Sequence, residues 1–162
     1  MAVIQDPYDT YGGSPIDWRN VVTQYGADPT GARDSTTAIQ GALNSGGTTY
    51  LPYGNFSVSS LECFSNTRLT GAGAGSVLLA NNSSATSVLT IAESAVGVMM
   101  DSFAVNVQSK GGVHGIYLNN TGVGQDSRHR LANLFVFNAG DDGIYLGPAA
   151  VEIGRASCRE RV

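Results

Sequence analysis

Short apolar runs separated by turn-forming residues occupy most of the chain. From residue 48 onward, runs rich in Val, Ile, Leu, Phe and Tyr alternate with clusters of Gly, Asn and Ser. Short runs of this kind, bounded by turn clusters, predict β-strands. The predicted strands cover residues 18–22, 49–51, 56–58, 68–70, 77–79, 88–91, 103–107, 116–118, 134–137 and 144–146.

One early segment has a helical period instead. Its apolar residues are spaced by one, three and four positions and form a single stripe: Ala38, Ile39, Ala42 and Leu43. Asp34 and Ser35 can cap its start, and the glycines at 46 and 47 can end it. A helix near residues 35–44 is marginally stable alone, so it must pack its apolar stripe on another element. Residues 25–31, before it, predict a turn cluster.

Two of the predicted strands repeat along the chain. The sequence Gly-Ile-Tyr-Leu at 115–118 returns at 143–146, and the apolar run at 103–105 returns at 134–136. A period of about 30 residues indicates a solenoid. Short strands at this period predict an all-β fold, a parallel β-helix whose coils stack at about 4.8 Å. A β-sandwich with coincidental repeats is the alternative.

The composition agrees with a strand-and-turn fold and excludes several function classes. Glycine accounts for 21 of 162 residues, and charged residues for only 14%. The net charge of −4 and the lack of a basic run argue against nucleic acid as a partner. No apolar stretch approaches the ~18 residues of a membrane-spanning helix, so no membrane partner is expected. Cys63 and Cys158 allow one disulfide at most.

The two ends of the chain differ in character from the predicted solenoid. Residues 1–17 are polar and rich in turn formers, which predicts a linker or tail, and they lack the pattern of a secretory signal. Residues 152–162 (EIGRASCRERV) resemble the in-frame translation of a sequencing adapter. We therefore expect a non-native tail there, with the natural domain truncated at its C-terminal side. A short basic helix closing the domain is the alternative.

The most specific signals lie between Val21 and Val58. They are Tyr25-Gly26-Ala27, Asp28-x-Thr30-Gly31, Asp34-Ser35-Thr36, Ala38-Ile39-Gln40 and Tyr50-Leu51-Pro52-x-Gly54-x-Phe56-x-Val58. This segment resembles the N-terminal signature of pectate-lyase-like proteins of the rhamnogalacturonase/epimerase type, found in secreted polysaccharide-degrading enzymes and phage tailspikes. The resemblance implies a right-handed parallel β-helix over residues 18–151, with the short N-terminal helix capping its open end.

The best candidates for catalysis come late in the chain. Asp141 and Asp142 lie in a turn before a predicted strand, and the segment resembles the Gly-Asp-Asp motif of polygalacturonase-type hydrolases. One carboxyl group could act as acid and another as base. The 28-residue repeat places His114 one coil away from Asp142. The alternative is that both aspartates only form the turn, and the same turn-and-cap interpretation is preferred for Asp28 and Asp34.

Aromatic and basic residues supply candidates for substrate binding. The repeat places Tyr117 beside Tyr145, and both rings should point outward if the flanking Ile and Leu residues point inward. Such a pair could contact sugars or simply stabilise the sheet. Arg128 and Arg130 lie in the most charged stretch before the predicted tail, residues 125–130, which could line a groove or form a solvated loop.

These observations leave two classes of function open. The first is a polysaccharide-degrading enzyme, a hydrolase or a lyase, in a secreted protein or phage tailspike; the present chain would then be an inactive part of it. The second is a non-catalytic carbohydrate-binding or structural shaft of a tail fibre. Either implies an extracellular or virion-associated location and allows a homotrimer. No spacing demands a metal or other cofactor, although the resemblance leaves calcium open for a lyase.

Overall fold

The computed structural model describes residues 18–119 and 128–147. The expected tails at 1–17 and 152–162, and residues 125–127 of the charged stretch, lie outside these ranges, so the predicted division of the chain stays a prediction. The described elements are β1 (Trp18–Asn20), β2 (Thr30–Asp34), α1 (Thr36–Asn44), β3 (Thr48–Leu51), β4 (Gly54–Val58), β5 (Leu61–Cys63), β6 (Arg68–Gly71), β7 (Ser76–Ala80), β8 (Ser87–Ile91), β9 (Met99–Asn106), β10 (His114–Leu118), β11 (Arg130–Phe137) and β12 (Ile144–Leu146).

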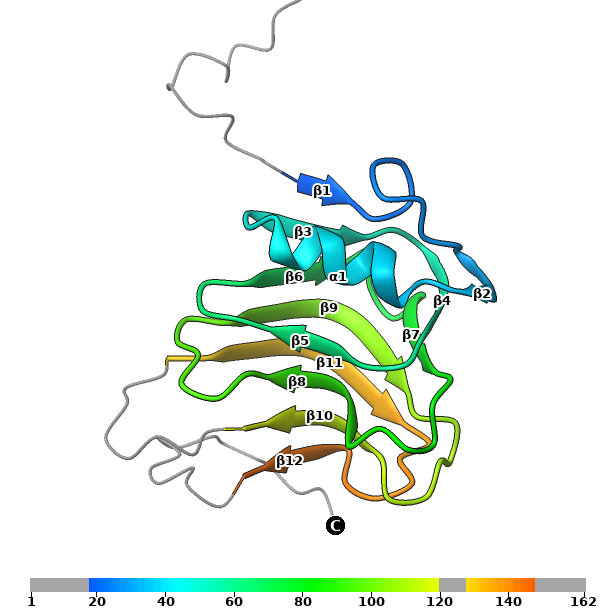
Figure 1. Cartoon of the computed structure of the whole chain (residues 1–162), viewed down its shortest axis with the longest axis vertical. Coiled ribbons are helices and arrows are strands. Elements are labelled where there is room, and N and C mark those ends of the chain that lie inside the picture. The colour runs from blue at the N-terminus through cyan, green and yellow to red at the C-terminus, as the bar shows by residue number, and fades with distance from the viewer. Residues whose placement is uncertain (1–17, 120–127, 148–162) are drawn as a thin grey trace, which may run out of the picture.

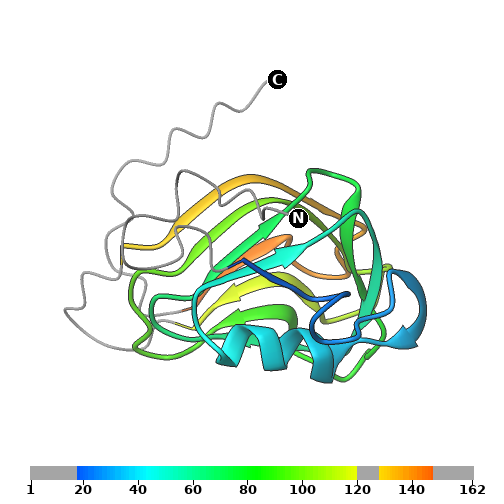
Figure 2. The same ribbon diagram turned by 90° about the horizontal axis from the view of Figure 1, so that it is seen from above.

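The strands form a parallel β-helix of about four turns, as the repeats predict (Figure 1). An eight-stranded sheet has the order β1-β3-β6-β9-β7-β4-β2, with β11 also paired to β9. A four-stranded sheet has the order β12-β10-β8-β5. All pairs between neighbouring strands are parallel, which rules out consecutive hairpins and therefore the sandwich alternative. Figure 2 shows the strands wound around a common interior.

The register of the coils matches the sequence repeats. Ile116 pairs with Ile144 and with Leu89, and Leu134 pairs with Phe103. Inward-facing residues of successive coils therefore lie on one another and form a continuous apolar core, in which Leu89, Phe103 and Ile116 are fully buried. This stacking is what keeps each coil from exposing its apolar face.

The helix α1 covers one end of the solenoid, as predicted. Ile39, Ala42 and Leu43 are buried on its inner face. The Gln40 side chain accepts a hydrogen bond from the Glu62 N–H at 2.9 Å and donates one to the Glu62 carbonyl at 3.0 Å. Gln40 thus stands in for a neighbouring strand at the open edge of β5. Among the described residues, no helix is long and apolar enough to cross a membrane.

Asp28 and Asp34 are structural residues of this end. Asp28 accepts hydrogen bonds from the Thr30 side chain and from the Thr30 and Arg33 backbone N–H groups. Asp34 accepts one from the first N–H of α1, at Thr36. Ser35 occupies the N-cap position of α1, as expected, but its hydroxyl makes no cap hydrogen bond. It instead accepts a hydrogen bond from the Asp28 N–H, because Ser35 is buried against that turn.

Two strands escaped the sequence analysis. Residues 30–34 lack an apolar alternation, yet they pair with β4 as β2, an edge strand defined by its backbone. Residues 61–63 form β5, which is too short for a periodic pattern. Both assignments depend on a neighbouring coil and not on the local sequence.

Candidate functional site

The candidate site lies on the outer face of the four-stranded sheet. Ile116 is buried on the inner face of β10, so its neighbour Tyr117 points outward. The register aligns Glu62, Thr90, Tyr117 and Tyr145 across the four strands. The sequence analysis found only the two tyrosines of this row, because it did not predict β5, which carries Glu62, and because Thr90 lies outside the Gly-Ile-Tyr-Leu repeat.

His114 and Asp142 meet across one coil step, as the 28-residue repeat predicts. The Asp142 backbone N–H donates to His114 Nδ1 at 3.3 Å, and Nδ1 lies 3.7 Å from Asp142 Oδ2. Accepting that hydrogen bond requires a lone pair on Nδ1, so this geometry fits a neutral imidazole with its proton on Nε2.

The turn that carries the two aspartates is held by the preceding coil. Asn138 has a positive φ of 51° and donates from its side-chain amide to Asn106 Oδ1 at 3.1 Å. At Gly140, an added Cβ would lie 1.7 Å from the Lys110 carbonyl oxygen. The glycine of the Gly-Asp-Asp sequence is therefore required by close backbone approach, which gives this part of the motif a structural explanation.

The three candidate catalytic residues form one cluster. Asp141, Asp142 and His114 each offer a ligand atom, and these atoms lie within 4.8 Å of one another. Both aspartates are exposed. Inverting hydrolases need about 6.5–9.5 Å between carboxyl groups to admit a water. The two aspartates are too close for that arrangement.

The same cluster is a poor match for calcium. Calcium takes about six to eight oxygen ligands. Here two carboxylates and an imidazole come together, and imidazole suits transition metals better than calcium. The residues present do not fit the calcium that the family resemblance leaves open for a lyase.

The outward aromatic rings pack against one another. His114 and Tyr145 stack with ring centroids 4.5 Å apart and an interplanar angle of 7°. Tyr117 and Tyr145 lie 5.3 Å apart at 32°. These contacts stabilise adjacent strands, and they direct ring faces toward each other. The Tyr117 hydroxyl also donates to Asn119 Oδ1 at 3.4 Å.

The structure does not bring the predicted arginines to this cluster. Arg130 begins β11 and pairs in register with Met99, in the eight-stranded sheet. Arg128 lies just before β11 and is exposed. Between them, His129 Nδ1 accepts a hydrogen bond from the Val98 N–H at 3.3 Å, and burial lowers the pKa of His129.

A comparison with known families matches residues 18–100 to the model described as rhamnogalacturonase A/epimerase, pectate lyase-like. The match covers slightly more than half of the chain. The chain belongs to this family. The candidate residues of this pectate lyase-like chain, from 114 to 145, follow the matched segment, so the match establishes the family and leaves their roles open.

Solved structures share the fold at low sequence identity. The A-module of the Azotobacter vinelandii mannuronan C-5 epimerase AlgE4 is 23% identical, with a TM-score of 0.68 over 80% of this chain and 42% of the module. Full-length tailspike protein 2 from the Escherichia coli O157:H7 bacteriophage CAB120 is 24% identical, with a TM-score of 0.66 over 78% of this chain and 19% of the tailspike. The catalytic unit of the Streptomyces thermodiastaticus α-1,3-glucanase is 23% identical, with a TM-score of 0.53 over 83% of this chain and 33% of that unit.

The chain thus spans less than half the length of each of these structures. A search of curated proteins finds no match.

Proposed function

We propose that the outer face of the four-stranded sheet binds a polysaccharide and that His114 and Asp142 transfer protons to or from it. The observation that carries this proposal is the clustering of His114 and the exposed Asp141 and Asp142 beside the half-buried aromatic pair, on one face of the sheet. The family and the printed names of the similar structures, which include an epimerase of mannuronan and a glucanase, support a sugar polymer as the ligand.

The geometry gives each residue a distinct role in this proposal. Asp142 and His114 form the acid–base pair, because their titratable atoms, His114 Nδ1 and Asp142 Oδ2, lie 3.7 Å apart. Asp141 adds a second negative charge beside this pair. Tyr117 and Tyr145 contact the sugar through ring edges and hydroxyl groups.

Binding is the first test. Titration of the chain with oligosaccharides of mannuronan, galacturonan and α-1,3-glucan should give affinity for at least one of them. Tyr145→Ala should weaken that binding, whereas Tyr53→Ala should not, because Tyr53 is a 78% exposed tyrosine outside the four-stranded sheet. Equal affinity of the two variants would contradict the proposed surface.

Turnover separates the enzyme from the binding protein. We expect none from the 162-residue chain, because a sugar polymer crosses several coils of about 4.8 Å each and the candidate catalytic residues lie on only two adjacent coils. The proposed proton transfer therefore requires a protein with further coils around the same residues. The assays are new reducing ends, unsaturated products and, by NMR, epimerised residues. Turnover lost in Asp142→Asn and kept in Glu62→Gln would establish the catalytic role and overturn the expected inactivity.

The alternative function is carbohydrate binding without catalysis in a tail fibre or similar shaft. The packing of the three rings against one another favours it, because sheet stability alone explains that packing. Binding that depends on Tyr145 and is unaffected by Asp142→Asn and His114→Gln would support this alternative. The expected homotrimer and the extracellular or virion-associated location stay predictions.

A further inference from the structure

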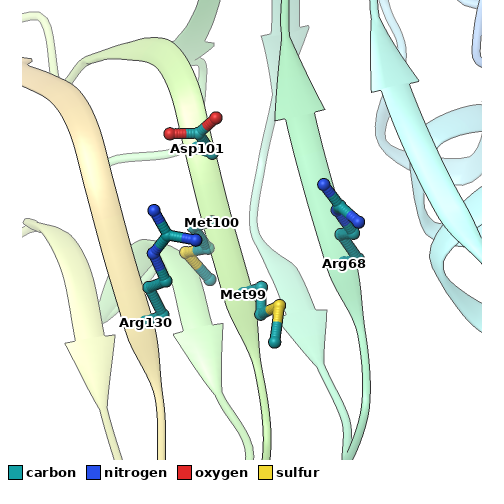
Figure 3. A pocket seen from close by; sticks show the side chains of 5 residues that line it. All are labelled: Arg68, Met99, Met100, Asp101 and Arg130. Carbon is teal, nitrogen blue, oxygen red and sulfur yellow. The ribbon is translucent and has the colours of Figure 1, made fainter.

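A surface pocket on the eight-stranded sheet is lined by two arginines from non-adjacent coils. Its walls are Arg68, Met99, Met100, Asp101 and Arg130. Figure 3 shows Arg68 on β6 and Arg130 on β11, on either side of the β9 residues Met99 and Asp101. Arg68 and Arg130 both align with Met99 in register, so they lie in one row across three strands.

The two guanidinium groups are not neutralised by neighbours. Within residues 18–119 and 128–147, neither side chain makes an ion pair or a hydrogen bond. The carboxylate of Asp101 lines the same pocket, but its oxygens accept hydrogen bonds from the Ser102 hydroxyl at 3.1 Å and the Asn133 side-chain amide at 2.9 Å. The pocket therefore carries two positive charges and one negative charge.

The spacing suits a single anionic group between the arginines. Two coil steps separate their backbones by about 9.6 Å, and both side chains rise from the outer face on either side of the partly exposed Met99. Guanidinium groups bind carboxylate and sulfate oxygens through paired N–H donors. The chain as a whole has a net charge of −4, but it repels an anion at this pocket only weakly. Surface charges farther away than a Debye length of about 8–10 Å are screened.

We propose that Arg68 and Arg130 bind one carboxylate or sulfate group of an acidic polysaccharide above Met99. This anion site lies on the eight-stranded sheet and is separate from the His114–Asp142 cluster on the four-stranded sheet. The inference that the pocket binds an anion depends only on the two arginines. The choice of a sugar polymer as its carrier rests on the proposed function.

The test is calorimetric titration with oligogalacturonate, sulfated dextran oligomers and neutral dextran oligomers, with inorganic sulfate as a fourth probe. Arg68→Gln and Arg130→Gln should each weaken binding of an acidic oligomer about fivefold, as expected for one exposed charge contact. The double variant should remove it. Asp101→Asn should strengthen binding of the acidic oligomer, because it removes a negative charge that repels the anion. The amide oxygen can still accept the hydrogen bond from Asn133.

Arg33→Gln is the matched control. It removes the same charge from an exposed arginine that lies in β2 and pairs with Asp28, so it should leave affinity unchanged. Unfolding midpoints of all variants establish that they are folded. Unchanged affinity in the double variant, or equal affinity for neutral oligomers, would overturn the anion site.

The titrations with inorganic sulfate and with Tyr145→Ala show which molecule carries the anionic group and distinguish this proposal from the proposed function. Inorganic sulfate binding as tightly as the oligomers would overturn the assignment to a polymer. Acidic oligomers that bind through Arg68 and Arg130 but are insensitive to Tyr145→Ala would support the anion site while contradicting the proposed surface on the four-stranded sheet. The reverse pattern would reject the anion site alone.

Discussion

The two ends of the described solenoid expose very different amounts of apolar surface. At the α1 end, Ile39, Ala42 and Leu43 are buried, and Gln40 occupies the backbone edge of β5. At the β12 end, Ile144 is 47% exposed and Leu146 is 37% exposed. Ile144 and Ile116 are register partners, yet Ile116 is fully buried. Burial in this fold is therefore set by the coil on either side and not by the residue itself.

The largest expected effect comes from the two partner isoleucines. Ile116→Ala should lower the free energy of unfolding by about 2–5 kcal/mol, because it leaves a cavity in the continuous core. Ile144→Ala, the same change one coil away, should cost less than about 1 kcal/mol, because a half-exposed side chain gains little from burial. Chemical denaturation of both variants measures the difference. Equal losses would mean that the terminal coil with β12 is covered as well as the interior coil with β10.

The isoleucine pair also shows how far the sequence determines the fold. The Gly-Ile-Tyr-Leu repeat predicts the register of β10 on β12 and, through it, the contact of His114 with Asp142. Local pattern also predicts α1, because an apolar stripe and polar caps are properties of adjacent residues. The strands β2 and β5 could not be predicted, since their only signal is pairing to another coil.

The same limit applies to the surface sites. Arg68 and Arg130 lie in one row because β6 pairs with β9 and β9 pairs with β11. The sequence shows no repeat between β6 and β9 that would have predicted the first pairing. Arg130 drew attention as part of a charged stretch, whereas Arg68 gave no signal. The His114 cluster could be found in the sequence because it adjoins the repeated Gly-Ile-Tyr-Leu segments. The arginine pair can be recognised only when all coils are aligned.

A smaller effect is expected from opening the covered edge. Gln40→Ala removes both hydrogen bonds to the Glu62 backbone and exposes the edge of β5. We expect a loss of about 1–2 kcal/mol in the free energy of unfolding, the net value of two such bonds. Thr37→Ala, at an exposed position of the same helix, should be close to neutral. A Gln40 variant as stable as the Thr37 variant would show that the apolar stripe alone covers this end.

The smallest effect concerns pH and again belongs to the α1 end. Hydrogen bonds from the Thr30 side chain and backbone, with further help from the Arg33 N–H and charge, lower the pKa of Asp28 from 3.8 to about 2. The Thr36 side chain and backbone lower the pKa of Asp34 in the same direction. Below about pH 4 the unfolded chain therefore binds these protons more readily than the folded chain does, so stability falls as the pH drops toward 2.

Asp28→Asn should flatten this acid dependence, because an amide has no proton to take up in that range. The measurement is the denaturant midpoint at a series of pH values between 6 and about 2, for the unaltered protein, Asp28→Asn and Asp34→Asn. Asp28→Asn should start from a lower midpoint at neutral pH, since Asn offers one accepting oxygen where the carboxylate uses two. It should then lose less on acidification than the unaltered protein. An identical slope for the two would show that the turn around Asp28 does not couple protonation to the covered end of the solenoid.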